Sequence, residues 1–210
     1  MKILITGGAG FVGSNLALKL KEKYADYQIV VFDNLKRRGS ELNLNSFVQH
    51  NIQFIHGDVR NSEDFDEIPE FDILIDASAE PSVMAGITTS VSGLVNINFN
   101  GTINCLNLAK RRKSGFLFLS TSRVYPIEDL ESAKFVETET RFEWGDDQVL
   151  PGINSKGITE NFPLTGSRSF YGSSKLASEL FVEEFNKLSG LKTIINRCGV
   201  IAGPKQMGKV

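Results

Sequence analysis

Residues 2–13, KILITGGAGFVG, decide the fold of this 210-residue chain. The apolar run at 3–5 is typical of a buried parallel strand, and it breaks into a glycine-rich turn before a helical pattern of leucines. A second apolar run, 29–32, ends on Asp33, which stands 20 positions after Gly13 (33 − 13 = 20). Strand, glycine turn, helix, strand and acid in this order predict a dinucleotide-binding site.

Each part of this pattern has a physical role toward a dinucleotide. One glycine allows the tight bend, one lets the backbone approach the pyrophosphate, and one lets the helix pack on the strand. The helix N-terminus offers free N–H groups and the positive end of its dipole to the phosphates. Asp33 can accept hydrogen bonds from an adenosine ribose diol and would repel a 2′-phosphate, so we expect NAD. Two alternatives stay open: an NADP site using Arg37 and Arg38, and a purely structural glycine turn.

Composition and charge exclude several classes of protein. Hydrophobic residues make up 41% of the chain and charged residues 23%, as in soluble globular proteins. A net charge of −2 gives no electrostatic surface for nucleic acid or for an anionic membrane. Cys105 and Cys198 lack C-x-x-C spacing, which predicts free buried thiols in a reducing compartment. Without a leader or a membrane-length apolar run, a cytoplasmic location is expected.

Apolar runs and helical patterns alternate along the rest of the chain. Strands are predicted at 52–56, 71–76, 116–119 and 191–196. Helices are predicted around 41–49, in the second half of 88–112 and from Tyr171 onward; the second of these places on or near one face Leu94, Val95, Ile97, Leu106 and Leu108. The basic run 110–113 is interpreted as the last turn of that helix. This alternation predicts an α/β fold, a Rossmann-type doubly wound parallel sheet, with a polar and aromatic insertion at 126–168.

Two strand ends carry further candidates for cofactor contact. Asp58 follows the predicted strand 52–56 and can accept a hydrogen bond from an adenine amino group, while Val59 packs on the ring. The alternative is that Asp58 caps the following helix. The small residues Ala77, Ser78 and Ala79 follow the strand 71–76 and would let a cofactor lie close to the backbone.

Hydroxyl groups, a tyrosine and a lysine are candidates for the chemistry. Thr121 stands between two serines after the strand 116–119, and Tyr171 and Lys175 are spaced to share a helical face. An ammonium near a phenol favours the phenolate and so lowers the phenol pKa. The phenol can then exchange a proton with a substrate oxygen that a hydroxyl also hydrogen-bonds. A surface pair on a helix is the alternative.

Five motifs together give the chain a specific resemblance over essentially its whole length. They are TGGAGFVG at 6–13, GDVR at 57–60, NFNGT at 98–102, STSRVY at 120–125 and YGSSK at 171–175. In combination they resemble the extended short-chain dehydrogenase/reductases of the nucleotide-sugar epimerase/dehydratase group. The resemblance implies a homo-oligomeric NAD-dependent enzyme acting on a nucleotide-sugar.

The resemblance also implies roles for individual residues. The catalytic group is Thr121, Tyr171 and Lys175. Substrate contacts are expected at Ser82, Ser122 and Arg123, and no metal is expected. The NAD contacts that it implies are Gly7, Gly10, Phe11, Val12, Gly13, Asp33, Asn34, Asp58, Val59, Ala77, Ser78, Ala79, Asn98, Ser120, Tyr171, Lys175 and Cys198.

Departures from the group pattern refine the expected reaction. Asp76 stands where the group usually has histidine, and the loop 80–83 is unusual. Ser122 and Arg123 replace the Asp-Glu pair of the dehydratases, which argues against dehydration. The insertion at 126–168 and residues 196–204 most resemble the CDP-paratose 2-epimerase (CDP-tyvelose epimerase) branch, and hence imply C2 epimerisation of a CDP-hexose. A 4-epimerase, decarboxylase or reductase of the same group, or a non-enzymatic NAD-binding regulator, remain alternatives.

The expected domain organisation is one NAD-binding domain over 1–210, with the insertion lining the substrate side. Few residues follow Pro204, too few to close a pocket over a nucleotide-sugar. We therefore expect a longer polypeptide whose C-terminal substrate domain is largely missing here. An open cleft and exposed apolar surface near the strand 191–196 are expected to accompany it.

Overall fold

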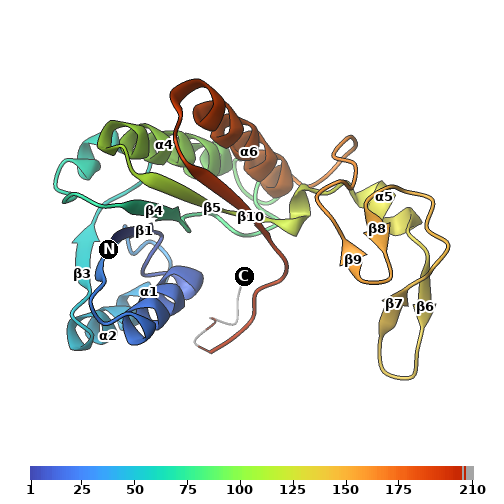
Figure 1. Ribbon diagram of the computed structural model, residues 1–210, viewed down its shortest axis with the longest axis horizontal. Helices are drawn as coiled ribbons and strands as arrows, with labels where there is room; N and C mark the ends of the chain where they lie inside the picture. The colour runs from blue at the N-terminus through green and yellow to red at the C-terminus, as the bar shows by residue number, and fades with distance from the viewer. Residues whose placement is uncertain (205, 207–210) are drawn as a thin grey trace.

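A six-stranded parallel sheet forms the centre of the molecule (Figure 1), as given by a computed structural model that describes residues 1–204 and 206. In sequence order its strands are β1 (Lys2–Thr6), β2 (Gln28–Asp33), β3 (Gln53–His56), β4 (Ile73–Asp76), β5 (Gly115–Thr121) and β10 (Thr193–Cys198). Their order across the sheet is β10-β5-β4-β1-β2-β3. The strand order therefore reverses at β1, since β2 and β3 are added on one side of it and β4, β5 and β10 on the other. Such sheets form a ligand crevice at this point, outside the carboxyl ends of the strands.

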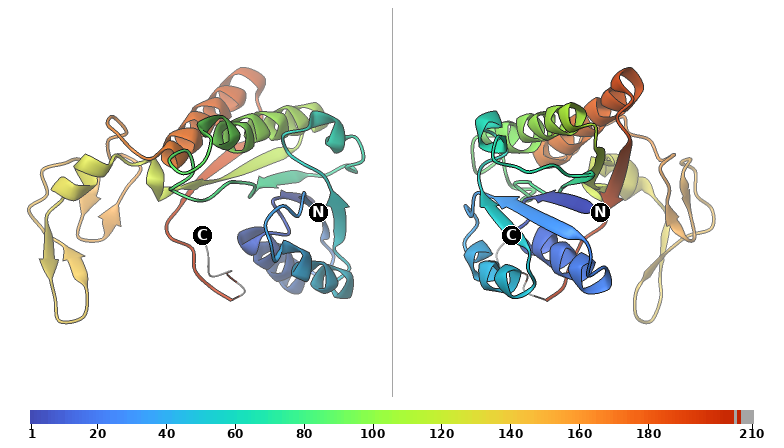
Figure 2. Two further views of the ribbon diagram at one scale, coloured as in Figure 1. Left: turned by 180° about the vertical axis from the view of Figure 1, so that it is seen from behind. Right: turned by 60° about the vertical axis from the view of Figure 1, so that its left-hand side comes forward.

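Helices cover both faces of the sheet, which confirms the predicted doubly wound architecture (Figures 1 and 2). On one face lie α1 (Phe11–Lys23) and α2 (Leu44–Gln49). On the other lie α4 (Gly101–Arg112) and α6 (Phe170–Ser189). Short turns of 3₁₀-helix, at Ser40–Asn43, Ser62–Phe65 and Ser122–Val124, connect these elements.

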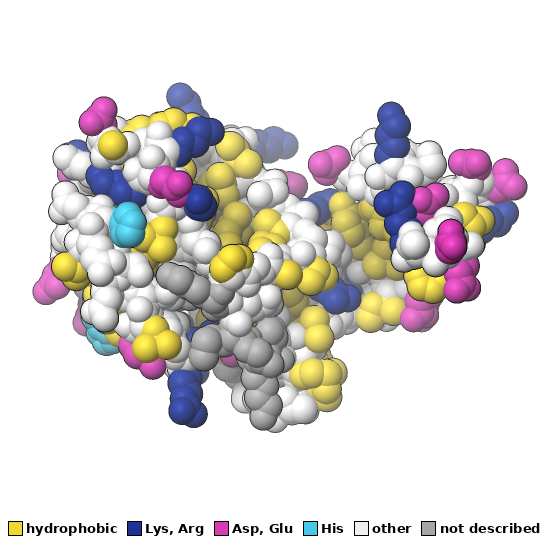
Figure 3. Space-filling model, turned by 90° about the horizontal axis from the view of Figure 1, so that it is seen from below, with side chains coloured by type: hydrophobic (Ala, Val, Ile, Leu, Met, Phe, Trp, Pro, Cys, Tyr) yellow, Lys and Arg dark blue, Asp and Glu magenta, His cyan; other side chains and the backbone are white. Residues whose placement is uncertain are grey.

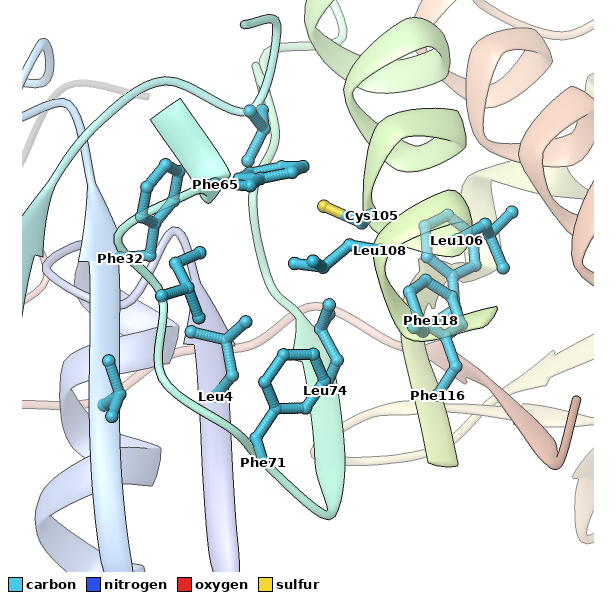
Figure 4. Close-up of a cluster of buried hydrophobic side chains, with 14 of the residues drawn as sticks. Leu4, Phe32, Phe65, Phe71, Leu74, Cys105, Leu106, Leu108, Phe116 and Phe118 are labelled. Carbon is cyan, nitrogen blue, oxygen red and sulfur yellow. The ribbon is translucent and has the colours of Figure 1, made fainter. Parts of the chain in front are cut away.

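Two hydrophobic clusters hold the helices against the sheet. Leu4, Phe32, Leu74 and Phe118 of the strands pack with Leu106 and its neighbours on the α4 and α6 side (Figure 4). The cluster on the opposite face of the sheet has fewer buried residues, among them Ile3, Ile5, Val31 and Phe47. Burial of these side chains on both faces explains why the strands are continuous apolar runs rather than alternating ones.

Several predicted boundaries differ from the structure. The helix expected only in the second half of 88–112 starts earlier, because α3 (Val91–Val95) and a π-helical turn, η3 (Asn96–Asn100), lead directly into α4. The π-turn changes the helical period, and Val95 is 37% exposed instead of joining the buried Leu94, Leu106 and Leu108. The sixth sheet strand, β10, also runs two residues beyond the predicted end at 196. The basic run after residue 109 does end α4, as predicted.

The insertion at 126–168 forms a projecting lobe with secondary structure of its own (Figure 1). It contains α5 (Ile127–Ser132), the hairpin β6 (Phe135–Glu137) and β7 (Phe142–Trp144), and the hairpin β8 (Ile153–Asn154) and β9 (Gly157–Ile158). A third hydrophobic cluster anchors it through Val124, Tyr125, Ala133, Ile153 and Phe162. In the view from below, hydrophobic side chains lie on the surface between the lobe and the main body (Figure 3).

The thiols only partly match their prediction. Both are free, and Cys105 is fully buried under the sheet, but Cys198 lies at the end of the edge strand and is partly exposed. Ile194 on the same edge strand is 62% exposed, so apolar surface is exposed there as expected. Within the part of the chain that the structure describes, no helix combines the length and apolar character needed to cross a bilayer. Expectations about the residues after Pro204 fall on Lys205 and 207–210, which lie outside the described residues.

Candidate functional site

The glycine turn, residues 7–10, bends tightly at the carboxyl end of β1. Gly7 has φ +62°, and a Cβ there would lie 2.6 Å from the Cα of Ser78. A Cβ on Gly13 would lie 2.4 Å from the Gly7 carbonyl oxygen, so a glycine at this position lets α1 pack against the turn. Two of the predicted glycine roles, the bend and the close helix packing, are therefore visible in the backbone.

The N-terminus of α1 is suited to phosphate. Gly10 is its N-cap, no side chain caps the helix, and no acidic residue stands in the first turn. The N–H groups at Phe11, Val12 and Gly13 come before the first internal hydrogen bonds of an α-helix can form, and the dipole adds positive potential. An uncapped helix start beside a glycine turn fits the pyrophosphate of a dinucleotide.

Asp33 lies at the end of β2, next to the glycine turn. Its carboxylate accepts hydrogen bonds from the N–H groups of Ala9 (3.1 Å) and Leu35 (2.8 Å). Burial raises the pKa of this carboxyl above its ordinary value, and the two N–H donors act in the opposite direction. Asn43, which the sequence analysis did not single out, donates from Nδ2 to the Ala9 carbonyl (2.9 Å). The two side chains thus hold the two peptide groups that flank Ala9 in the turn.

The adenine candidates lie on the neighbouring strand end. Asp58 accepts from Asn34 Nδ2 (2.8 Å) and pairs with Arg60 (2.5 Å), and Arg60 holds the Asp58 pKa well below its usual range. It caps no helix, because the next helical turn is capped at Asn61. Val59 is 7% exposed and packs on Gly101, so most of its side chain already belongs to the core. Asn34 and Asp58 are therefore hydrogen-bonded to each other, and the contacts of Asp58 and Val59 with adenine stay predictions.

The segment after β4 is fixed by a buried carboxylate. Asp76 is fully buried, and its oxygens accept from Thr6 Oγ1 (2.8 Å), Thr102 Oγ1 (2.8 Å), and the N–H (3.1 Å) and hydroxyl (2.6 Å) of Ser78. Ala77 and Ala79 flank Ser78 on this segment, and Ser78 faces Gly7 across the turn. Sequence reasoning noted Asp76 only as a departure from a pattern and missed this network.

Asn98 supports the same region from the π-helical turn. Its amide accepts from the Glu80 N–H (2.8 Å) and donates to the Glu80 carbonyl (3.2 Å) and to Ser174 Oγ (3.1 Å). The amide is therefore engaged with protein groups, and it ties the loop after β4 to α6. Its predicted contact with NAD stays a prediction.

Thr121 and Tyr171 meet at the carboxyl end of β5. Thr121 ends the strand and accepts from the Arg123 N–H (3.2 Å), and its hydroxyl interacts with the phenol of Tyr171 in the first turn of α6. Ser169 caps that helix through the Gly172 N–H (3.1 Å). A Cβ on Gly172 would lie 2.1 Å from the Arg123 carbonyl oxygen, so glycine lets the helix start this close to the strand end.

Lys175 lies one turn further along α6 and is only 2% exposed. Its Nζ donates to the Leu119 carbonyl (3.0 Å) and stands 4.4 Å from the centre of the Phe118 ring. Burial lowers the Lys175 pKa, and Asp76 is the first of several groups that act against this. The ammonium is thus placed against Phe118 and Leu119 of β5.

One predicted effect has the opposite direction in the structure. Lys175 was expected to depress the Tyr171 pKa, but burial raises this pKa above its ordinary value. The groups that favour the phenolate are the Thr121 hydroxyl and the charge of Arg123. The expectation is wrong for the protein alone, because the loss of hydration raises the phenol pKa by more than these two groups lower it.

A second buried network, also missed from the sequence, lies under the same strand ends. Glu179 is 1% exposed and forms a two-pronged ion pair with Arg197 of β10, with Nη2 and Oε2 2.7 Å apart. Ser120 donates to the other carboxylate oxygen, Oε1. Arg197 also donates to the Tyr125 hydroxyl (3.4 Å), at the root of the projecting lobe. Ser120 is therefore turned toward α6, which leaves its predicted NAD contact untested.

The remaining predicted residues lie on β10 and in the segments that follow β5 and β4. Cys198 is the register partner of Thr121 across β10 and β5. Ser122 and Arg123 form the turn after β5, with Arg123 exposed, and Ser82 lies in the loop after β4. Their contacts with substrate stay predictions. Among the residues the structure describes, no group of three or more His, Cys, Asp or Glu side chains could hold a metal ion.

Comparison with known proteins identifies the family. Residues 3–210 match the family model "NAD dependent epimerase/dehydratase family". The chain is 34% identical over 212 aligned residues to CDP-paratose 2-epimerase of Salmonella typhi, which covers 98% of this chain and 59% of that protein. The chain thus spans little more than half the length of this relative.

Solved structures agree with this match. dTDP-glucose 4,6-dehydratase from Bacillus anthracis, in complex with NAD, superposes with a TM-score of 0.71 at 26% identity, covering 98% of this chain and 57% of that one. UDP-glucose 4-epimerase from Thermotoga maritima, with UDP-glucose, gives a TM-score of 0.68 at 25% identity, covering 94% and 55%. The glycine turn, the uncapped helix and Asp33 fit the cofactor that the family uses, and the chain belongs to the NAD-dependent epimerase/dehydratase family.

Proposed function

We propose that this chain carries the NAD site and the reacting groups of an epimerase that acts on a nucleotide-linked hexose. A CDP-hexose inverted at C2 is the substrate class we favour. The observation that supports the proposal most is the interaction of the Thr121 hydroxyl with the Tyr171 phenol at the carboxyl end of β5. Lys175 lies one turn further along α6 and donates to the Leu119 carbonyl of the same strand. A phenol that exchanges protons beside a dinucleotide site is what reversible oxidation of a sugar hydroxyl requires.

The bound nicotinamide supplies a reversible hydride acceptor for the sugar carbon. Tyr171 takes the proton from the hydroxyl on that carbon, while Thr121 donates a hydrogen bond to the same oxygen. The keto-sugar then presents its other face, and Tyr171 returns the proton to the carbonyl oxygen as the carbon regains its hydride. Lys175 holds the ribose of the cofactor. The sugar ends at the oxidation level at which it began, so NAD is not consumed.

The choice of a CDP-hexose and of C2 rests on similarity. CDP-paratose 2-epimerase is the relative named above, and the lobe at 126–168 and residues 196–204 resemble that branch. Because the chain spans 59% of that relative, the activity is proposed for the whole protein in which this domain works.

Dehydration is the second reaction to weigh, since one structural neighbour is a dTDP-glucose 4,6-dehydratase. Water elimination needs an acid and a base next to the oxidised sugar, supplied in that group by an Asp-Glu pair. Ser122 and Arg123 occupy those positions here, and neither is a carboxyl group. A hydroxyl and a guanidinium cannot exchange protons near neutral pH as a carboxyl pair can, so we favour epimerisation.

The test uses a CDP-hexose deuterated at C2, incubated with NAD and the protein, with UDP- and dTDP-hexoses as comparisons. Product NMR and the absorbance of reduced nicotinamide are followed together. We expect inversion at C2 with deuterium retained, and a transient reduced nicotinamide that forms more slowly from the deuterated sugar. Loss of deuterium to solvent, elimination of water, inversion at C4 or net accumulation of reduced nicotinamide would each contradict the proposal.

A further inference from the structure

Asp76 is a buried carboxylate for which the proposed reaction has no use. It ends β4 and is fully buried, and in the described part of the chain its hydrogen-bond donors are all neutral, those of Thr6, Ser78 and Thr102. Within the described residues no Lys, Arg or His lies within ion-pair distance of it. A negative charge in the interior is costly unless another charge compensates for it.

Lys175 is the complementary case on the facing helix. It is 2% exposed, and its ammonium contacts the Leu119 carbonyl and the Phe118 ring. No carboxylate of the described chain forms a direct ion pair with it. The nearby Glu179 is already committed to Arg197 and Ser120. Lys175 is therefore a buried positive charge that also needs compensation.

Phe118 brings the two charges to one place. In the pairing of β4 with β5, Asp76 is the register partner of Phe118, so both side chains point to the same face of the sheet. Lys175 Nζ lies 4.4 Å from the centre of the Phe118 ring on that face. Thr102, which donates to Asp76, starts α4 on the same side. A buried carboxylate and a buried ammonium thus both lie next to Phe118, on the same face of the sheet, without forming a direct ion pair.

We propose that Asp76 is a positioning residue for NAD binding, whose charge keeps the buried Lys175 protonated and able to donate hydrogen bonds to the cofactor. The same carboxylate also fixes the segments on both sides of the glycine turn. It accepts from the hydroxyl of Thr6, immediately before Gly7, and from the hydroxyl of Ser78, which faces Gly7. The proposal rests on the assignment of Lys175 to the cofactor and is independent of which sugar the enzyme uses.

The electrostatic surroundings of Lys175 support this role. The titratable groups that act on it are Asp76, Cys198, Cys105 and Glu179, and all four favour its charged form. Asp76 is the largest of them, and it opposes the lowering of the Lys175 pKa by burial. Removing the Asp76 charge should therefore lower the Lys175 pKa further, and Lys175 should lose its proton at a lower pH.

The experiment measures the NAD dissociation constant by calorimetry from pH 6 to pH 10 for the wild type and three variants. Asp76→Asn removes the charge and keeps the shape, while Thr102→Val removes one hydrogen bond to Asp76 and keeps the charge. We expect affinity to weaken as pH rises through the Lys175 pKa, with the midpoint at lower pH in Asp76→Asn. Each unit of displacement weakens binding about tenfold above that midpoint. Thr102→Val should weaken binding without moving the midpoint, and Lys175→Met should lose the pH dependence.

A midpoint that is the same in Asp76→Asn and the wild type would overturn the proposal, and so would an equal displacement in Thr102→Val. Asp76→Asn can also fail to fold, since it leaves the Lys175 charge without its partner. The double variant Asp76→Asn/Lys175→Met then decides, because it removes both charges. It should melt at a higher temperature than Asp76→Asn, and an equal or lower melting temperature would contradict the pairing. None of these measurements needs a sugar substrate, so they stand apart from the test of epimerisation.

Discussion

The guanidinium of Arg197 donates two hydrogen bonds to one carboxylate oxygen of Glu179. Its Nη2 and Nε lie 2.7 and 3.0 Å from Oε2. Burial alone would lower the Arg197 pKa, but hydrogen bonds to Glu179 and Tyr125 raise it above its usual value. Since Ser120 donates to the same carboxylate, the pair joins α6, β5 and β10.

Replacing Glu179 with Gln should destabilise the fold strongly. It leaves the partly buried Arg197 without its counter-charge, a change that typically costs about 3–5 kcal/mol of unfolding free energy. Urea denaturation followed by circular dichroism measures the effect. Glu22→Gln, which removes an exposed pair with Lys19, is the matched control and should unfold at nearly the wild-type midpoint. Equal midpoints for the two variants would show that the buried pair contributes little.

Replacing Asp33 with Ser should weaken NAD binding by about 1–3 kcal/mol, the range for charge-assisted hydrogen bonds. It should also reduce the preference for NAD over NADP, because the charge that repels a 2′-phosphate is gone. Titration with both dinucleotides gives the two affinities. Asn43→Ala is the comparison, since it removes the side-chain hydrogen bond to the Ala9 carbonyl on the same turn. That variant should weaken NAD and NADP alike, and unchanged NAD affinity in Asp33→Ser would exclude Asp33 as the ribose ligand.

Replacing Tyr171 with Phe keeps the ring in place and removes the phenol. Turnover of the complete enzyme should fall by a factor of about 10² or more, while NAD affinity stays nearly unchanged. Lys175→Met should reduce both turnover and NAD affinity, because one ammonium serves both. Steady-state kinetics and calorimetry separate the two effects. A Tyr171→Phe enzyme with most of its activity would refute the assignment of the acid–base group.

The raised pKa of Tyr171 gives a dependence on pH. Burial keeps this phenol protonated in the folded chain at pH values where an unfolded tyrosine, with a pKa of about 10, has already ionised. The unfolded state then binds fewer protons than the folded state, so stability falls as pH rises between the two pKa values. Ultraviolet titration should show one late-ionising tyrosine that disappears in Tyr171→Phe. If that variant loses stability with pH as steeply as the wild type in this range, Tyr171 is not responsible.

Local signals allowed much of the cofactor side to be predicted. The glycine turn and Asp33 belong to one β-α-β unit, so spacing within about 30 residues was enough to bring them together. The β5 end and the start of α6 were also recognised, because each has its own short motif. The predictions that failed depend on contacts between residues far apart in the sequence. Asp76 on β4 accepts a hydrogen bond from Thr102 on α4, and burial within the fold sets the Tyr171 pKa. No local pattern reports such burial.

The predicted start of the helix in 88–112 was wrong for a related reason. The π-turn at Asn96–Asn100 is stabilised by Asn98, whose amide bonds Glu80 and Ser174 from other parts of the chain. A regular 3.6-residue period cannot reveal it, and Val95 was therefore assigned to the wrong face. The network of Glu179 with Arg197 likewise joins residues that sequence patterns treat as a helix interior and a strand.

Gly172 offers a sharp test of how Tyr171 and Thr121 are positioned. It follows Tyr171, and a Cβ there would lie 2.1 Å from the backbone oxygen of Arg123, far inside a normal contact. Gly172→Ala must therefore push the start of α6 away from the turn after β5 and separate Tyr171 from Thr121. Overpacking of this kind typically costs about 1–3 kcal/mol of stability. Gly199→Ala is the matched control, because nothing lies within 4 Å of a Cβ at Gly199.

The two glycine variants are compared by thermal unfolding and by the turnover of the complete enzyme. Gly172→Ala should melt at a lower temperature and lose turnover in a greater proportion than NAD affinity, since the glycine turn expected to bind the phosphates is elsewhere. Gly199→Ala should match the wild type in stability. A loss of NAD affinity as large as the loss of turnover in Gly172→Ala would show that the substitution unfolds the whole site. Wild-type turnover in that variant would show that the approach of α6 to β5 does not set the geometry of Tyr171 and Thr121.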